Sequence, residues 1–390
     1  MTLRKFLFWT HLAAGCTAGL VILIMSLTGV VLTYQRQILA SIERGAFRST
    51  PPSASARHLP VEELLAKVGA QRPLPASATL TLRADRAEPA EITAGRGAAL
   101  YVNPYTGQVL GSASPGPRQF FQSVTAWHRW FAAEGAGRAT ARAITGACNL
   151  AFLLLVLSGT YLWLPKVWSW RHVRPIAWFR GGLSGKARDF NWHNVFGVWA
   201  LVPLFLVVLT AVPMSYAWAN SLLFQIAGSP LPAPAGRPAG PGPGLGPSRP
   251  ADLTGLNQLW ARAQAQQPEW TSIAMRLPQA GEPAAVFTLD TGDGGQPQKR
   301  STLTLDRSAA AVVRWEAFAD NTTGRRWRSY ARFLHTGEAL GIAGQTAAGL
   351  ASFAGVMLVW TGLSLSLRRL SAWNARRQAK QEFAETALMK

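Results

Sequence analysis

Residues 11–34 read HLAAGCTAGLVILIMSLTGVVLTY, and this apolar, uncharged stretch decides the fold because it is long enough to cross a bilayer. Comparable stretches lie at 143–164, 195–218 and 341–367. A membrane span needs about 20 apolar residues at a rise of 1.5 Å each. Four such runs in one chain argue against a soluble fold, so we expect an α-helical integral membrane protein with four transmembrane helices.

The first span has a counterpart in residues 193–216, which read HNVFGVWALVPLFLVVLTAVPMSY. In both runs a glycine follows the histidine by four residues, and a threonine follows that glycine by thirteen. The matching residues are His11, Gly15 and Thr28 in the first run and His193, Gly197 and Thr210 in the second. Such an internal repeat predicts two parallel halves related by a pseudo-two-fold axis along the membrane normal.

The long connections between spans carry the pattern of small α+β domains. One helical run precedes several short runs in which apolar and polar residues alternate, and turn residues separate these runs. The first connection predicts a helix at 61–69 and strands at 78–83, 98–103 and 107–111; the second predicts a helix at 256–266 and strands at 271–277, 284–289 and 302–315. Each half is therefore expected to be a span, a small α+β domain and a second span.

The expected organisation follows from these runs. In chain order we predict a first transmembrane helix (1–34), a first α+β domain (35–126), an amphipathic segment with the second transmembrane helix (127–165), a basic loop (166–190), the third transmembrane helix (191–218), a Pro- and Gly-rich linker at 228–250 with the second α+β domain (219–330), the fourth transmembrane helix (331–367) and a tail (368–390).

The formal net charge of +20 is unevenly distributed. Basic residues gather at the N-terminus, in the 166–190 loop and in the 368–390 tail. Short basic segments stay in the cytoplasm, so we expect both termini to be cytoplasmic and the two α+β domains to lie on the other side. This distribution fits a lipid membrane, and we expect no nucleic-acid partner.

Four of the six histidines lie at membrane boundaries. His11 and His193 begin spans one and three on the inner side, whereas His128 and His335 precede spans two and four on the outer side. The pseudo-two-fold axis would bring the two members of each pair together. Two imidazoles that face each other in a helix bundle suit six-coordinate haem iron, which predicts an inner haem on His11 and His193 and an outer haem on His128 and His335.

Water and zinc are the alternatives to haem as partners of these histidines. Interfacial histidines can simply extend their polar tips to water, although this does not account for two symmetry-related pairs. Zinc usually needs three or four ligands, and no cysteine or carboxylate is expected beside these histidines. No C-x-x-C-H motif is present, so we predict two haem b groups without covalent attachment.

Other residues are candidates for haem surroundings or substrate contact. Gly15 and Gly197, one turn after their histidines, would let a flat macrocycle approach the helix. Candidates for haem propionates are Arg129, Arg328 and Arg332 on the outer side and Arg4, Lys5 and Arg188 on the inner side. Trp127, Trp130 and Trp327 form a predicted substrate rim, with the interfacial aromatic belt as the alternative. His58 and His172 are expected to be solvated.

Several motifs resemble the PepSY-associated transmembrane family over almost the whole chain. They are WHRWF at 127–131, SGTYLWLP at 158–165, NWHNVFG at 191–197 and RFLHTGEALG at 332–341, together with NPYTGQVLG at 103–111, which resembles the PepSY strand pair. Within that family the chain is similar to the inner-membrane ferric-siderophore reductases of the FoxB type. The resemblance implies a multi-pass protein of the bacterial inner membrane with two periplasmic PepSY-like domains. The second domain departs from the PepSY pattern at 303–315, so PepSY-type peptide binding is not expected there.

The resemblance also implies a function. The chain would be an oxidoreductase, a ferric-siderophore reductase that carries electrons across the membrane and reduces Fe(III) in the periplasm to release Fe(II). Haem would carry the redox chemistry, so no catalytic side chain is expected. No Gly-rich nucleotide fingerprint is visible, which leaves a quinol or a cytoplasmic reductase as electron donor. The alternatives are a di-haem cytochrome b that serves quinone or a partner redox protein, and a non-redox membrane-anchored PepSY binding module.

Overall fold

The computed structural model describes residues 2–75, 78–94, 98–232 and 252–388, so most of the predicted linker at 228–250 lies outside the described residues. Within this part of the chain, four helical segments are long and apolar enough to cross a membrane. They are α1 (Leu3–Leu32) with its continuation α2 (Gln35–Ala46), α5 (Gly137–Trp163), α7 (Gly185–Ser215) and α11 (Gly341–Leu388). The protein is therefore a multi-pass helical membrane protein.

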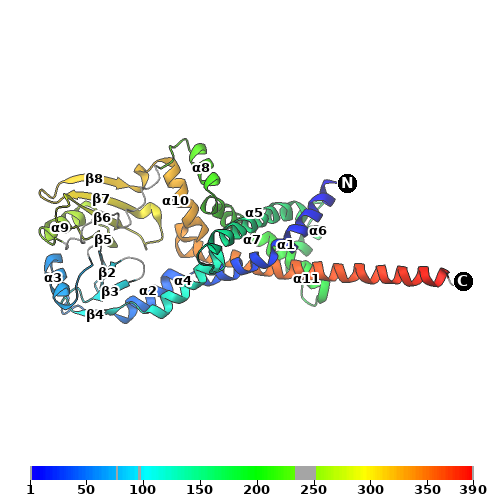
Figure 1. Ribbon diagram of the computed structural model, residues 1–390, viewed down its shortest axis with the longest axis horizontal. Helices are drawn as coiled ribbons and strands as arrows, with labels where there is room; N and C mark the ends of the chain where they lie inside the picture. The colour runs from blue at the N-terminus through cyan, green and yellow to red at the C-terminus, as the bar shows by residue number, and fades with distance from the viewer. Residues whose placement is uncertain (1, 76–77, 95–97, 233–251, 389–390) are drawn as a thin grey trace.

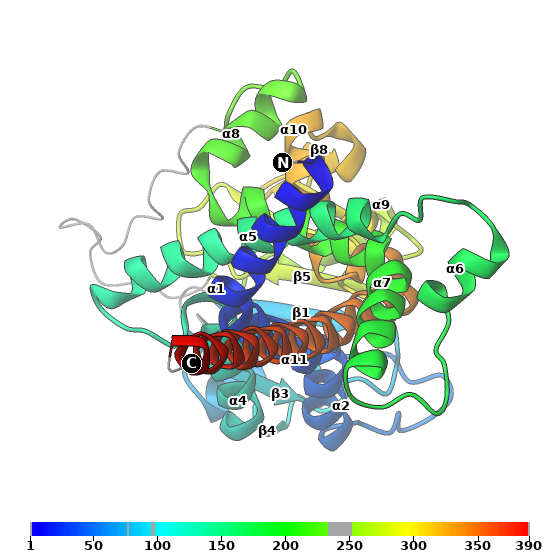
Figure 2. The same ribbon diagram turned by 90° about the vertical axis from the view of Figure 1, so that its right-hand side faces the viewer.

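The four spans form one bundle, seen from its end in Figure 2. Helix α11 packs against α1 and α7, and α5 packs against the same two helices. Small residues allow close approach: a Cβ atom added at Gly355 of α11 would lie 2.7 Å from Oγ of Ser26 on α1. Without a hydrophobic driving force in lipid, such close backbone packing is a main source of helix association.

Two amphipathic helices connect the bundle to the rest of the molecule. Helix α4 (Pro115–Trp130) contacts α1 and α5, and α10 (Thr323–His335) contacts α7 and α8 (Ala217–Ile226). The amphipathic segment predicted from residue 127 thus begins twelve residues earlier, at a proline that suits the first turn of a helix. A short helix, α6 (Trp170–Ala177), lies in the basic loop between α5 and α7.

Within the described residues, the strands form one continuous antiparallel sheet of eight strands in the order β4-β3-β2-β1-β5-β6-β7-β8. They are β1 (Thr79–Arg83), β2 (Ala90–Ala94), β3 (Ala98–Val102), β4 (Val109–Ser112), β5 (Ser272–Arg276), β6 (Ala284–Asp290), β7 (Arg300–Asp306) and β8 (Val312–Ala317). Strands β1 and β5 pair at the centre, with Leu80 opposite Met275. The two α+β domains expected from the sequence are therefore two halves of one sheet.

The two halves also share one hydrophobic core. Helices α3 (Val61–Gln71) and α9 (Leu256–Gln266) contribute to it from one face of the sheet, together with alternate strand residues such as Leu80, Ile273 and Phe287. The intervening residues, including Arg83 and Ser272, point to the opposite face. We call α3, α9 and the eight strands the sheet domain; one face of its sheet is apolar and covered, and the other is polar.

The structure differs from the predicted elements at three places. Strand β2 was missed, because AEITA is short and weakly apolar. The single run at 302–315 is two strands, β7 and β8, separated by a turn in which Ala310 has a φ of 50° and the Asp306 carboxylate accepts backbone N–H bonds. Helix α11 continues past residue 367 to Leu388 and projects beyond the other spans, at the end of the molecule opposite the sheet domain (Figure 1).

Candidate functional site

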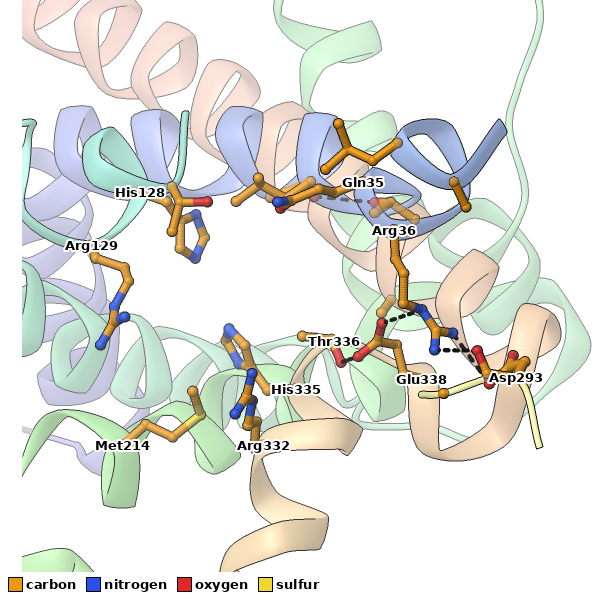
Figure 3. Close-up of a pocket in the computed structure, with 18 of the residues that line it drawn as sticks. Gln35, Arg36, His128, Arg129, Met214, Asp293, Arg332, His335, Thr336 and Glu338 are labelled. Carbon is orange, nitrogen blue, oxygen red and sulfur yellow. Dashed lines mark hydrogen bonds and ion pairs between the residues drawn. The ribbon is translucent and has the colours of Figure 1, made fainter. Parts of the chain in front are cut away.

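The structure brings the four boundary histidines together in the two predicted pairs. His11 on α1 and His193 on α7 form the inner pair, whose ring centroids lie 6.4 Å apart. His128 on α4 and His335 on α10 form the outer pair, with a centroid separation of 6.2 Å. Figure 3 shows the outer pair pointing toward each other across an open space. Helices far apart in sequence thus supply both members of each pair.

Hydrogen bonds fix the tautomer of each histidine. Nδ1 of His335 lies 2.8 Å from the carbonyl oxygen of Val207, and because a carbonyl only accepts, Nδ1 must donate. The other three Nδ1 atoms each lie 2.9 Å from a hydroxyl oxygen, which already donates its own proton to the backbone carbonyl one turn earlier. The hydroxyl partners are Ser158 for His11, Thr28 for His128 and Thr361 for His193. All four Nε2 atoms therefore keep a free lone pair, which suits metal binding.

The spacing of the rings fits one metal ion between each pair. Two metal–nitrogen bonds of about 2 Å, and roughly 1 Å from each nitrogen to its own ring centre, place two opposed imidazole centroids about 6 Å apart. Both observed separations agree with this value. Among the residues described, no cluster of three or more His, Cys, Asp or Glu side chains is placed to hold a metal. Each pair thus offers two nitrogen ligands. Haem iron needs two such ligands from the protein, whereas tetrahedral zinc needs three or four.

Two glycines make room for the histidine rings of the inner pair. A Cβ atom at Gly159 or Gly362 would lie only 3.2 Å or 3.4 Å from the Cε1 atoms of the two inner-pair histidines. Beside Gly15 and Gly197 an added Cβ would meet only leucine side chains, at ordinary contact distances. Gly159 and Gly362 each follow directly the residue that accepts the histidine hydrogen bond, and this hydroxyl–glycine dipeptide is the signal that sequence reasoning missed.

A cavity of about 1330 Å³ opens between the outer pair and the sheet domain. His128 and His335 lie on its wall, and the polar face of the sheet contributes Arg83, Ser272 and Thr288. In Figure 3 Arg129 lies on one side of the histidine pair, and Arg36 with its partners Asp293 and Glu338 lies on the other. We call this space the central cavity.

All three outer arginines that were predicted from the sequence as candidates for haem propionates line the central cavity. Arg129 follows His128 on α4, and Arg332 precedes His335 by three residues on α10. Arg328, one turn before Arg332, and Arg142 on α5 line the same wall. Burial and the neighbouring guanidinium groups lower the pKa of Arg129, which shows how closely these cations are gathered. Arg142 was not singled out, because in the sequence it looks like an ordinary basic residue flanking a span.

Of the three predicted rim tryptophans, the structure places only Trp130 on the wall of the central cavity. Guanidinium groups of Arg129 and Arg138 lie 4.9 Å and 3.9 Å from its ring centre. Trp127 and Trp327 have exposed side chains and are not among the residues that line the cavity. Trp127 precedes His128 by one residue, which turns it about 100° away around the helix. These two side chains fit the interfacial belt better than a substrate rim.

The inner pair has different surroundings from those expected. Arg4 donates to the carbonyl oxygen of Leu162 at the end of α5, and Arg188 pairs with Asp189. Asp189 is fully buried, lies one turn before His193 on α7 and also accepts from Ser364. Ion pairing explains why the chain tolerates a buried carboxylate here.

The remaining two histidines differ in burial. His172 on α6 is exposed, and its Nδ1 lies 2.7 Å from Oγ of Ser169. His58 packs against the Tyr105 ring at 5.0 Å, and its buried Nε2 has no hydrogen-bond partner among the described atoms. Burial, and then the nearby Arg86 charge, lower the pKa of His58. The prediction of a solvated His58 was wrong, because the chain before α3 folds back over the sheet domain.

Residues 8–369 match the family model described as the PepSY-associated TM region. The match includes all four spans, both histidine pairs and the intervening sheet domain. No curated protein matches the chain at a significant level.

Proposed function

The chain belongs to the family of PepSY-associated transmembrane proteins, and from this premise we propose that it is a di-haem b electron conduit that reduces ferric siderophores. The observation that carries the proposal is the pair of two-histidine sites. Each has a ring separation near that of opposed axial ligands, and four fixed Nε2 lone pairs are available in total. A haem b bound at each pair would supply reversible one-electron chemistry between Fe(III) and Fe(II).

The residues of the chain would hold these groups and exclude water. His11 and His193 would hold the inner haem, and His128 and His335 the outer one, with ring orientation fixed by the partners of their Nδ1 atoms. Mutation of such hydrogen-bond partners typically lowers metal affinity or activity by about 10- to 100-fold. Arg129 and Arg332 would pair with the propionates of the outer haem.

The central cavity supports a reaction with a small ferric complex. It adjoins the outer pair and opens toward the polar face of the sheet domain, so a chelate there would approach the outer haem edge. Hard oxygen ligands of the hydroxamate type hold Fe(III) far better than Fe(II), so one-electron reduction weakens the complex. The chain would thus act as a ferric-chelate reductase and release Fe(II) without a catalytic acid or nucleophile of its own.

We also propose on which side of the membrane the reaction takes place. The basic loop that contains α6 and the basic extension of α11 both lie at the end of the bundle away from the sheet domain (Figure 1). By the positive-inside rule this end would be cytoplasmic, which puts both termini inside and the sheet domain in the periplasm of a bacterial inner membrane. The electron donor would be a quinol or a cytoplasmic reductase.

Purified protein, expressed with haem supply, tests the proposal. Pyridine haemochrome analysis should give two haem b groups per chain, and His193→Ala and His335→Ala should remove two different spectral components. Chemically reduced protein should be reoxidised by a ferric trihydroxamate without any partner protein. Reoxidation only by quinone or by a partner protein would favour a di-haem cytochrome b instead. A complete absence of haem would leave the membrane-anchored binding module.

A further inference from the structure

Four arginines on the wall of the central cavity have no counter-ion within the described residues. They are Arg129, Arg142, Arg328 and Arg332, and none forms an ion pair or donates a side-chain hydrogen bond there. They come from α4, α5 and α10, so the fold gathers them from three helices. Like charges that converge in this way cost free energy unless a ligand neutralises them.

The carboxylates of the cavity wall are all paired with arginines, seven carboxylates with six arginines, because Asp293 and Glu338 share Arg36. The wall carries seven carboxylates, and each has an arginine partner: Glu43 pairs with Arg118, Asp85 with Arg48, Glu88 with Arg44, Glu91 with Arg83, Asp290 with Arg300, and Asp293 and Glu338 with Arg36. The paired groups therefore carry one net negative charge, and the four unpaired guanidinium groups bring the net charge to +3.

A single haem does not account for this charge or for the space. Its two propionates neutralise two of the four unpaired guanidinium groups, which leaves two of them without a partner and a net charge of about +1 around the cavity. The cavity volume of about 1330 Å³ also exceeds the range of roughly 300–1,000 Å³ that is usual for one small-molecule site. The cavity is thus large enough, and positive enough, for a second ligand that carries negative charge.

We propose that the central cavity selects ferric chelates of net negative charge, whose peripheral carboxylate groups bind the arginines that the propionates leave free. Arginine suits this role because its planar guanidinium binds a carboxylate through two parallel hydrogen bonds. This proposal rests on the function proposed above, and it adds the charge class of the substrate. It makes a cationic chelate the poorest ligand of the site.

The test uses three chelates with the same iron coordination and different charge. A linear trihydroxamate with a terminal amine forms a cationic ferric complex; its N-acetyl derivative gives a neutral complex and its N-succinyl derivative an anionic one. Their Ga(III) complexes have the same charges and cannot be reduced, so calorimetric titration of the haem-loaded protein measures binding alone. The anionic complex should bind about tenfold or more tightly than the cationic one, the order expected for a charge near unpaired guanidinium groups.

Matched variants locate the effect. In Arg142→Gln and Arg328→Gln, each checked for retention of both haems, the ratio of anionic to cationic affinity should fall by about tenfold. In Arg262→Gln, a change of equal charge at an exposed residue of α9, on the covered face of the sheet, the ratio should stay as in the wild type. In the unmodified protein, added salt should weaken binding of the anionic complex and strengthen that of the cationic one.

Equal binding of all three complexes, or preference for the cationic one, would overturn the inference. So would equal losses in the Arg142, Arg328 and Arg262 variants. These results are independent of turnover: if the Ga(III) complexes bind in the expected order but no Fe(III) complex reoxidises the reduced protein, the reductase function fails and the anion site stands.

Discussion

At the scale of single residues, the two halves of the repeat differ in the hydrogen-bond partners of their outer histidines. Thr28 and Thr210 occupy the same position in the two halves, and both donate to the carbonyl one turn earlier at 2.6 Å. Thr28 also accepts from His128, whereas His335 donates to the backbone of Val207. A glycine follows Thr28 but Ala211 follows Thr210, and this buried methyl group stands where Gly29 leaves space beside the histidine.

The hydrogen bond between Thr28 and His128 gives the first prediction. Thr28→Val removes the acceptor for Nδ1 of His128, so the ring loses its fixed orientation and becomes a weaker electron donor to iron. We expect the outer haem to dissociate about tenfold more readily, or to shift its midpoint potential, while the inner haem is unchanged. Redox titration with spectral separation of the two haems measures both effects.

Thr17→Val on the same helix is the control, because its hydroxyl bonds only to the backbone carbonyls of Ala13 and Ala14 and to no partner of a histidine. The two variants should differ clearly in the outer haem. If they behave alike, the hydroxyl of Thr28 serves the helix and not the histidine.

A second residue-scale prediction concerns His58. Its pKa is lowered in the folded protein, first by burial, so the unfolded chain binds more protons as the pH falls below about 6.5. The contribution of His58 to the free energy of unfolding is therefore fully present above about pH 6.5, and it is lost as the pH falls toward the pKa of the folded state. Thermal unfolding of the sheet domain, followed by circular dichroism, should show a decrease in Tm between pH 7 and pH 5.

His58→Phe keeps an aromatic ring against Tyr105 and should flatten this pH dependence. His172→Gln, at an exposed position on α6, should leave it as in the wild type. An unchanged slope in the His58 variant would mean that other groups cause the acid sensitivity.

The histidine pairs could be predicted from the sequence, but their partners could not. The repeat alone pairs His11 with His193, since symmetry relates them whatever the detailed packing. Ser158 lies 147 residues from His11, and only the packing of α5 against α1 brings them together. Three of the four unpaired arginines could be predicted, because Arg129, Arg328 and Arg332 lie in the sequence segments that carry the outer histidines, and Arg142 does not.

At the scale of elements, α4 is held at both ends. Near its start Arg118 forms two hydrogen bonds to Glu43 of α2, whose side chain is 3% exposed, and Tyr101 of β3 donates to the same carboxylate at 2.8 Å. Near its end His128 bonds to Thr28. The Glu43 cluster therefore ties the sheet domain, α2 and α4 together and sets the position from which His128 enters the site.

Arg118→Met should destabilise the sheet-domain side of the molecule. It leaves the Glu43 carboxylate buried with one partner fewer, and breaking a buried ion pair costs about 3–5 kcal/mol. We expect a lower unfolding temperature and partial loss of the outer haem, with the inner haem retained. Thermal unfolding and the Soret spectrum of the purified variant measure these effects.

Arg48→Met breaks the exposed ion pair with Asp85, whose side chains are 52% and 53% exposed, and is the matched control. Such surface pairs contribute about 0–1 kcal/mol. Equal effects of the two substitutions, or equal loss of both haems in the Arg118 variant, would show that the Glu43 cluster does not position α4.

The elements that the sequence predicted well are those with strong local periodicity, such as the four spans and the helices near 61–69 and 256–266. The joining of two small domains into one sheet could not be predicted, since it depends on the pairing of β1 with β5, almost two hundred residues apart. Each half exposes one apolar edge strand, and pairing the two edges satisfies backbone hydrogen bonds that either half alone would leave open.

At the scale of the whole molecule, the sheet domain lies at one end and the extension of α11 at the other (Figure 1). Between them stand the two histidine pairs. Seventeen residues of α1 separate His11 from Thr28, the partner of His128, which is about 25 Å of helix at 1.5 Å per residue. The hydrocarbon core is about 30 Å thick, so neither pair alone crosses it and the two in series do.

This arrangement predicts a reaction with a direction. In sealed vesicles with the sheet domain outside, verified by its accessibility to protease, an enclosed reductant should drive reduction of a ferric siderophore that is present only outside. An Fe(II) chelator that cannot pass the membrane should trap the product outside. The physical reason is that the central cavity lies between the outer pair and the sheet domain. A chelate bound in this cavity is therefore next to the outer redox centre.

His193→Ala, which removes a ligand of the inner pair, should stop this vectorial reaction while chemical reduction of the outer haem from outside continues. Thr17→Val is the control within α1, because its hydroxyl bonds only to backbone carbonyls and it touches no histidine; the reaction should persist. Reduction that continues in the His193 variant would mean that electrons reach the outer site without the inner one. Iron trapped on the inside would place the reduction at the wrong end of the molecule, and a cytochrome that serves a partner protein would then replace the reductase.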